Sequence, residues 1–231
     1  NYCYNITSIP ENLFQYNVNV QNFASAFQNT HITSIPTDLF RYTTGVTSFY
    51  RTFSDCQYIS SLPVDLFRYT TKVTTFYFCF SNNARLTSVS YDLFKYCTLA
   101  SNFQGTFFGC TTLTNTPALK YSTTHLTRAD YCFRNCPSLT GVTSDIFSGC
   151  TEVYTFEFAF YSCTGLTSIP SDLFSTNNKV TNFNSCFGYC SSLSGDAPTL
   201  WTRTSPTPTG TQCFYNDTGL SNYSSIPDNW K

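Results

Sequence analysis

The amino-acid sequence predicts a leucine-rich-repeat-sized solenoid of about eight stacked coils, each 26 or 27 residues long. Two observations lead to this prediction. First, a phenylalanine recurs at a nearly constant spacing along the chain, with Lys120 and Trp201 at the two places where it is absent. Second, the segments between successive phenylalanines are of two alternating types. The recurring phenylalanines are Phe14, Phe27, Phe40, Phe53, Phe67, Phe80, Phe94, Phe107, Phe133, Phe147, Phe160, Phe174, Phe187 and Phe214.

Each complete repeat consists of two half-units. The first half-unit reads Ile32-Thr-Ser-Ile-Pro36-Thr-Asp-Leu-Phe40, and the second reads Val46-Thr-Ser-Phe49-Tyr-Arg-Thr-Phe53. Proline occurs at a fixed place in the first half-unit and is absent from the matching place in the second. The coil is therefore the full repeat, whose length is that of a leucine-rich repeat. The alternative, one coil for every half-unit, would be an unusually tight solenoid.

The residue types within the first half-unit predict its local structure. Leu, Ile or Val at its start and three residues later should point inward, and the Thr-Ser pair between them should face solvent in a short parallel strand. Proline ends that strand because it has no amide hydrogen to donate. The aspartate two residues later suits the N-cap of a single helical turn that carries Leu-Phe. These aspartates are Asp38, Asp65, Asp92, Asp145 and Asp172.

The regular repeats occupy residues 1–194, and residues 195–231 are expected to form a degenerate C-terminal cap. Terminal repeats of solenoids usually deviate because they cover an open core. Here the proline-containing segment 196–201 is one residue short and lacks the recurring aspartate, and Pro206 and Pro208 then interrupt the usual second half-unit. The chain opens partway through a repeat, with Cys3 and Ile6 in the positions that follow a missing phenylalanine, and we therefore expect it to be part of a larger protein.

Composition argues against several functional classes. Charged residues make up 11% of the chain and the net charge is −1, so the basic surface of a nucleic-acid-binding protein is not expected. Apolar runs are too short for a membrane span, so no membrane insertion is expected. The aromatic content of 18% indicates a folded chain.

All twelve cysteines occupy repeat positions. Eight lie three residues after a recurring phenylalanine position, where other repeats have Thr, Asn or Asp, and four lie one residue before it, where others have Ala or Thr. Such exchange indicates small inward-facing groups and free thiols. Disulfides between stacked coils remain the alternative, because the coil spacing falls within the Cα range of a bridge. His31 and His125 share no recurring spacing with the cysteines, so zinc is not expected.

The recurring aspartates favour capping over a calcium column, since each stands alone in its coil without further oxygen ligands. The sequence shows no Ser-His-Asp order, glycine-rich phosphate loop or His-x-x-x-His spacing. We therefore predict no catalytic residues, no metal site and no cofactor, and a protein that is not an enzyme.

The string Phe-x-x-Cys-x-x-Leu-Thr-x-Ile-Pro at 160–170, with the neighbouring Ala159-Phe160-Tyr-Ser-Cys163, resembles the BspA-like leucine-rich repeat family. The family's unit is shorter, and the glycine of its Val-x-x-Ile-Gly segment is replaced here by varied residues. The resemblance covers nearly the whole chain and implies a surface or secreted microbial adhesion module that binds host proteins or other cells. Similar arrays occur in phage tail proteins.

The candidate binding residues come from the positions that vary most, the two that follow the inner phenylalanine of the second half-unit. Aromatic residues and arginine at these positions are types enriched in binding hot spots. The alternative is that Phe78 and Phe158 turn inward and Tyr50 covers a loop. A second column, from Thr7 and Thr33 to Thr167 and Ser194, forms a hydroxyl stripe. The predicted ligand-binding residues are Tyr50, Arg51, Tyr77, Phe78, Tyr131 and Phe158.

These observations favour a non-enzymatic binding or adhesion module that recognises a host or cell-surface protein or a glycan. The expected location is extracellular, at a microbial cell surface or a virion. The alternative is a structural spacer within a larger surface protein or phage tail fibre. An ice-binding surface made of the hydroxyl stripe is a third interpretation.

Overall fold

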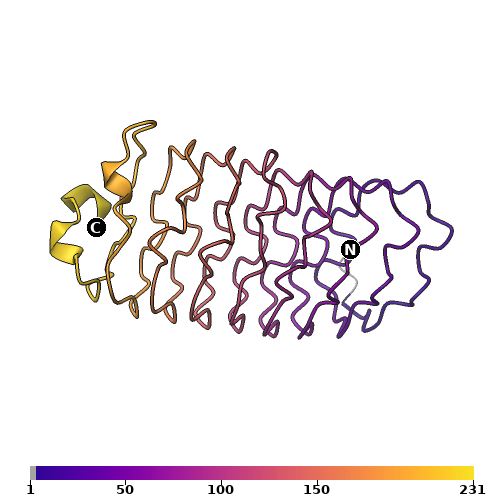
Figure 1. Cartoon of the computed structure of the whole chain (residues 1–231). Helices are drawn as coiled ribbons and strands as arrows, with labels where there is room; N and C mark the ends of the chain where they lie inside the picture. The colour runs from indigo at the N-terminus through magenta and orange to yellow at the C-terminus, as the bar shows by residue number, and fades with distance from the viewer. Residues whose placement is uncertain (1–3) are drawn as a thin grey trace.

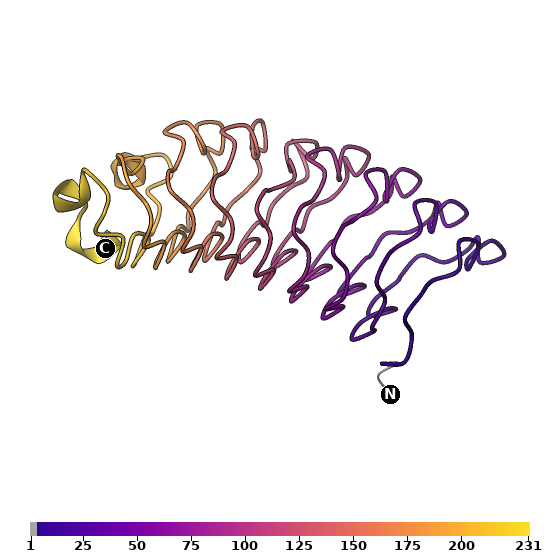
Figure 2. The ribbon, with the colours of Figure 1, turned by 90° about the horizontal axis from the view of Figure 1, so that it is seen from below.

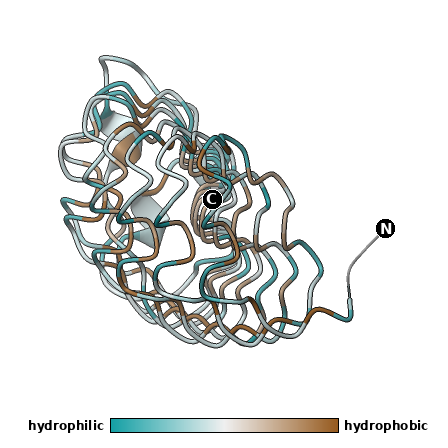
Figure 3. Cartoon of the chain, turned by 90° about the vertical axis from the view of Figure 1, so that its right-hand side faces the viewer, coloured by the Kyte–Doolittle hydropathy of each residue, from teal (hydrophilic) through white to brown (hydrophobic). Residues whose placement is uncertain are grey.

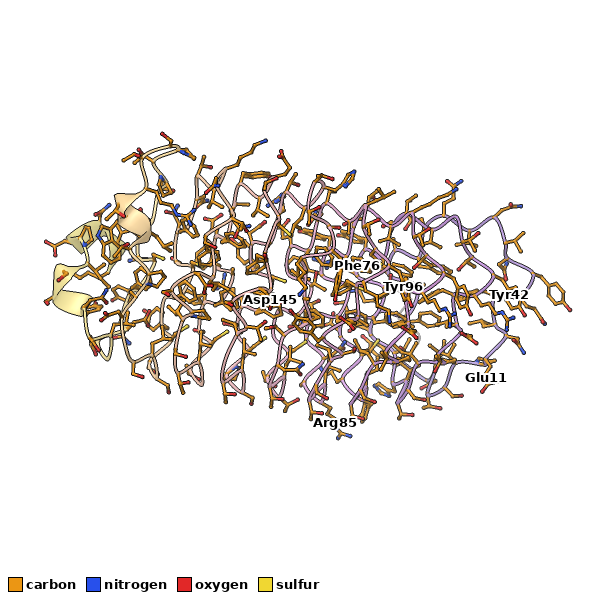
Figure 4. All side chains as sticks on the ribbon, viewed as in Figure 1. Glu11, Tyr42, Phe76, Arg85, Tyr96 and Asp145 are labelled. Carbon is orange, nitrogen blue, oxygen red and sulfur yellow. The ribbon has the colours of Figure 1, made fainter. Side chains whose placement is uncertain are left out.

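The computed structural model describes residues 4–231. The chain winds as a stack of coils, and the first and last coils lie at opposite ends of an arc (Figures 1 and 2). Figure 3 looks along the stack and shows the coils one behind another. Side chains fill the interior, as Figure 4 shows for Phe76, whereas Arg85 projects from the lower edge.

A ladder of parallel bridges connects the second half-units. Each bridge joins the residue before the inner phenylalanine to its equivalent one full repeat later, as in the bridge from Ser48 to Thr75. A further parallel bridge joins Ser61 to Ser88 in the first half-units. The ladder residues are Asn22, Ser48, Thr75, Asn102, Arg128, Thr155, Asn182 and Thr209.

The expectation of short strands and single helical turns is wrong in detail. Residues 4–231 contain isolated bridges but no continuous strand, because the extended backbone ends soon after each ladder residue. The Asp-Leu-Phe segments are turns, and the helices in this part of the chain are three short 3-10 helices near the C-terminus. These are η1 (Leu200–Thr202), η2 (Tyr223–Ser225) and η3 (Asp228–Trp230).

Backbone hydrogen bonds connect the coils along one edge, which we call the turn edge (residues 22–29 and their equivalents). Four amides at alternate residues donate to carbonyls of the next coil, as in Phe49 to Thr75 (3.0 Å) and Phe53 to Cys79 (2.9 Å). Two residues per coil have a left-handed backbone, for example Arg51 (φ 49°). This conformation is uncommon outside glycine and asparagine. It recurs at 25, 51, 78, 105, 131, 158, 185 and 212 and four residues after each of these.

Three of the five recurring aspartates connect neighbouring coils, and the segments that follow them are turns rather than capped helical turns. Asp65 pairs with Lys95 (3.1 Å), and Asp145 pairs with Lys120 (2.5 Å). The Tyr121 hydroxyl donates to Asp92. Each partner lies close to one repeat away in sequence, so these carboxylates contribute contacts between coils.

The core consists of three columns of phenylalanine rings. The column of second-half phenylalanines, which we call the continuous column, is unbroken, with neighbouring ring centroids 5.3–5.8 Å apart and planes within 15°. Offset stacking of this kind adds to the free energy gained from burial. Its members are Phe27, Phe53, Phe80, Phe107, Phe133, Phe160, Phe187 and Phe214.

The other two columns are interrupted at the same coil. Lys120 replaces the first-half phenylalanine there, and Ala129 replaces the inner phenylalanine. The same two positions deviate again near the C-terminus, where they hold Trp201 and Gly210. The Trp230 ring occupies the space beside Gly210, since a Cβ there would lie 2.1 Å from the ring. Trp230 thus fills the core of the last coil from the chain end.

The arc follows from unequal spacing across the coil. In the first-half column, neighbouring centroids are 5.7–6.3 Å apart, wider than in the continuous column, which belongs to the turn edge. The hydrogen-bonded turn edge therefore lies on the inner side of the arc in Figure 2.

Replacing Phe107 with alanine should lower the free energy of unfolding by about 3–5 kcal/mol, because the ring is fully buried in the continuous column. Phe108→Ala is the matched control, since the adjacent ring is only half-buried and should matter less for stability. Urea denaturation of both variants measures the difference. A loss below about 1 kcal/mol for Phe107→Ala would contradict a core built on this column.

Candidate functional site

All six predicted binding residues lie on the turn edge. Tyr50 is 39% exposed, and the other five are half-buried. Arg51, Phe78, Tyr131 and Phe158 have a left-handed backbone, with φ between 49° and 58°. Phe78 and Phe158 remain partly exposed and do not join the core, so the alternative of inward-turned rings does not describe them.

The four N-terminal members form one cluster. The Tyr50 and Tyr77 rings stack with centroids 5.2 Å apart and planes 7° apart. Phe78 meets Tyr77 edge-on at 4.7 Å. The Arg51 guanidinium lies over Tyr50 at 5.6 Å and over Phe78 at 5.4 Å. These distances are those of cation–π contacts, so the arginine joins rings of two coils.

Tyr131 and Phe158 form a second cluster around an arginine that the sequence analysis did not identify. Their rings stack at 5.1 Å, and the Arg134 guanidinium lies 5.5 Å from Tyr131 and 4.7 Å from Phe158. It also lies 4.8 Å from the Tyr161 ring and 5.9 Å from the Phe108 ring. Arg134 is therefore surrounded by aromatic side chains of three coils.

Phe108 connects the two clusters. Gly105 separates them in sequence, but the Phe78 ring lies over this glycine, where a Cβ would be 2.6 Å from the ring. Phe78 then contacts Phe108 at 5.7 Å, and Phe108 contacts Arg134. Tyr161 extends the array edge-on to Tyr189 and Tyr215. We call the whole array the aromatic strip: Tyr50, Arg51, Tyr77, Phe78, Phe108, Tyr131, Arg134, Phe158, Tyr161, Tyr189 and Tyr215.

Phe108, Arg134, Tyr161 and Tyr215 were missed because each directly follows a phenylalanine of the continuous column. The predicted binding residues come only from the two variable positions after the inner phenylalanine. Variation directly after the recurring phenylalanine is just as large and was the available signal. That second variable column reads Gln28, Ser54, Ser81, Phe108, Arg134, Tyr161, Gly188 and Tyr215.

The arginines of the aromatic strip differ from Arg128 beside it in how their charge is paired. Arg128 donates two hydrogen bonds to Asp130, at 3.0 and 2.8 Å, whereas the ion pairs of residues 4–231 include neither Arg51 nor Arg134. The buried Nε atoms of both arginines have no hydrogen-bond acceptor. Burial, and secondarily the Glu157 carboxylate, raises the pKa of the Tyr131 hydroxyl, which is therefore neutral at physiological pH.

The hydroxyl stripe is used internally. Thr114 donates its hydroxyl to the Thr87 carbonyl (3.0 Å), and Thr167 donates to the Thr140 carbonyl (3.1 Å). Thr87 and Ser194 donate in the same way, so four hydroxyl groups of the stripe help to hold neighbouring coils together. These four hydroxyl groups have no hydrogen left to donate to an ordered water layer.

Several cysteines also form hydrogen bonds between neighbouring coils. The eleven in residues 4–231 are free and buried, and Cys3 lies outside the described residues. Cys110 donates to the Phe80 carbonyl (3.1 Å) and Cys163 to the Phe133 carbonyl (3.0 Å), both in the preceding coil. Burial raises the pKa of both thiols to about 12. A neutral buried thiol is a poor nucleophile and a poor metal ligand.

Asp217 lies three residues after Phe214, the position that Cys110 and Cys163 occupy in their coils, but it makes no comparable hydrogen bond. Its side chain is buried and neither carboxylate oxygen has a hydrogen-bond partner. Burial raises its pKa to about 8. Asn83 fills the equivalent position by donating to the Phe53 carbonyl (3.1 Å), a bond that an ionised carboxylate cannot make.

Within residues 4–231, no three His, Cys, Asp or Glu side chains are grouped so that they would hold a metal ion. None of the helices in that range has the length and apolar character needed to cross a membrane.

Comparison with known proteins gives distant likenesses. No protein-family model and no curated protein matches this sequence. Among solved structures, the leucine-rich repeat domain of APL1B is 21% identical over 62% of this chain and 35% of its own, with a TM-score of 0.30. A leucine-rich repeat protein from Bacteroides ovatus is 16% identical over 98% and 86%, with a TM-score of 0.24. At these TM-scores, the likenesses carry no argument about function.

We predict that the cysteines are reduced. Treatment of the denatured, unreduced protein with an alkylating reagent should label all eleven described cysteines, whereas the native protein should react little because its thiols are buried. Intact-mass measurement counts the labels. Labelling of two or fewer cysteines after denaturation would indicate disulfides and contradict the prediction.

Asp217 should make the protein less stable as pH rises. Its folded-state pKa of about 8 exceeds the value of 3.8 expected without burial, so the folded state binds the proton more tightly. The resulting stabilisation is complete below about pH 4 and is lost as pH rises to about 8, at up to about 1.4 kcal/mol per pKa unit.

Asp217→Asn should remove this pH dependence, because a neutral amide already serves at Asn83 and Asn177. The matched control is Asp196→Asn, an exposed aspartate of the same segment. Urea denaturation at pH 5 and pH 8 measures the effect. If the free energy of unfolding depended on pH equally in the wild type and in Asp217→Asn, Asp217 would not titrate in this range.

Proposed function

We propose that this chain is a non-enzymatic binding module that recognises a protein or a glycan through the aromatic strip. The observation that carries the proposal is continuity: half-exposed rings and two arginines contact one another from Tyr50 to Tyr215 along the hydrogen-bonded turn edge. Large amphipathic rings on a rigid frame bury much area at little entropic cost, and they dominate binding energy at interfaces.

The wider setting rests on the repeat and on the family resemblance. The ladder of parallel bridges, whose steps are 26 or 27 residues, supports the repeat length on which this proposal rests. A BspA-like array of this kind is expected at a microbial cell surface or on a virion, as part of a larger chain. The buried, neutral thiols support a non-enzymatic role.

The second candidate is a structural spacer within a surface protein or phage tail fibre. It is favoured by the hydroxyl stripe and the phenylalanine columns, which hold the coils together and need no ligand. A spacer, however, does not account for rings at positions that other coils fill with Ala24, Ser25 or Gln28. The strip therefore favours binding.

The test begins with a screen of the fragment against glycan arrays and host matrix proteins. For any ligand found, Tyr50→Ala and Tyr77→Ala should each weaken binding by roughly tenfold, because each removes a stacked ring. The controls are Thr33→Ala and Thr167→Ala, which lie in the exposed hydroxyl stripe. Surface plasmon resonance measures all four variants. Weakening by the threonine variants alone would place the site on the stripe.

A further inference from the structure

We propose that the partner of the aromatic strip is an acidic protein segment, whose carboxylates pair with Arg51 and Arg134. This inference deepens the proposed function and rests on it. It assigns the chemistry of the ligand and the two residues that select it.

The first argument is that the same arrangement occurs twice. Each arginine lies between rings of neighbouring coils, is half-buried and has a buried Nε atom without an acceptor. The five ion pairs in the described part of the chain use other cations: Lys95, Lys120, Arg128, Lys179 and Lys231. Two guanidinium groups on the strip therefore lack an anionic partner.

The aromatic rings leave the N–H donors of the two guanidinium groups without hydrogen-bond acceptors. An aromatic face attracts a cation but accepts no conventional hydrogen bond, whereas a guanidinium carries five N–H donors in a planar fork. A carboxylate matches that fork with two acceptor oxygens. The rings hold each guanidinium in place before the partner arrives, which lowers the entropy lost on binding.

Nearby acidic residues do not satisfy the two arginines. Asp55 accepts hydrogen bonds from Ser54 (2.6 Å) and Asn82 (2.8 Å). Asp130 is held by Arg128. Glu157 acts electrostatically on Tyr131 but forms no ion pair with Arg134.

The ring geometry favours a protein over a glycan. Sugars bind aromatic side chains by lying on an open ring face. Here Tyr50 and Tyr77 cover each other, Tyr131 and Phe158 do the same, and the arginines lie over further faces. The strip therefore presents mainly ring edges, hydroxyls and guanidinium groups, which suit a polypeptide.

The spacing of the arginines defines a probe. They belong to coils three repeats apart, which is about 14 Å at the usual spacing of hydrogen-bonded chains and about 17 Å at the ring spacing of the continuous column. Flexible glutamate side chains can cover the difference. An extended peptide rises about 3.3 Å per residue, so carboxylates four residues apart are separated by about 13 Å. A peptide with the pattern Glu-x-x-x-Glu should therefore reach both arginines at once.

The experiment compares a labelled Glu-Ala-Thr-Ala-Glu peptide with its Gln-Ala-Thr-Ala-Gln counterpart by fluorescence anisotropy at low salt. We expect the glutamate peptide to bind at least roughly tenfold more tightly, and R51Q/R134Q to remove that difference. R68Q is the matched control, because Arg68 is exposed and lies over a single ring, Tyr69. It should leave the tenfold difference unchanged. Thermal melts confirm that each variant is folded.

Equal binding of the two peptides, or no binding of either, would overturn the proposal, as would an equal loss in R68Q. A heparin hexasaccharide provides the glycan arm. If it alone binds, and R51Q/R134Q abolishes that binding, the ligand is an acidic glycan instead. A partner from the screen whose binding falls in Tyr50→Ala but persists in R51Q/R134Q would refute this inference and leave the proposed function standing.

Discussion

The backbone hydrogen bonds between turn edges are the interaction on which the rest of the structure depends. Alternate amides donate to the next coil, so the coils stay in register and equivalent side chains stack. That register aligns the continuous phenylalanine column inside the stack and the aromatic strip outside it. Left-handed residues such as Arg51 and Tyr131 complete the turns, and they also direct variable side chains onto the surface. The turn edge thus contributes the continuous column to the core and the aromatic strip to the surface.

Much of the core was predictable because it depends on spacing alone. A residue that recurs at a fixed interval occupies the same place in every coil, and phenylalanine at that place must be buried. The strands and helical turns were not predictable in this way. An isolated bridging residue such as Ser48 or Ser61 makes no strand, and some aspartates pair with residues of another coil, as Asp65 does with Lys95. The local conformational propensity of a residue does not indicate which side chain of an adjacent coil will contact it.

The candidate site shows the same division. Tyr50 and Tyr77 were identifiable because they vary within a constant frame, and their stacking follows from the register. The link through Phe108 was not identifiable, because it depends on the Phe78 ring lying over Gly105. The left-handed backbone at Phe78 gave no sequence signal either, since phenylalanine rarely adopts it. An alignment of the repeats shows which residues are equivalent, but it does not show which columns of residues contact each other.

The coil that contains Lys120 and Ala129 contacts its neighbours differently from the other coils in the middle of the stack. Two of the three phenylalanine columns are interrupted there. The outer side is connected instead by the ion pair between Lys120 and Asp145 and by the hydrogen bond from Tyr121 to Asp92. The Lys120 ammonium lowers the pKa of Asp145 to about 2, so this pair stays charged through the physiological range. Dispersion between rings is indifferent to ions, whereas partly exposed charges are screened by them. Added salt should therefore weaken the contact between Lys120 and Asp145 more than it weakens the contacts between stacked rings.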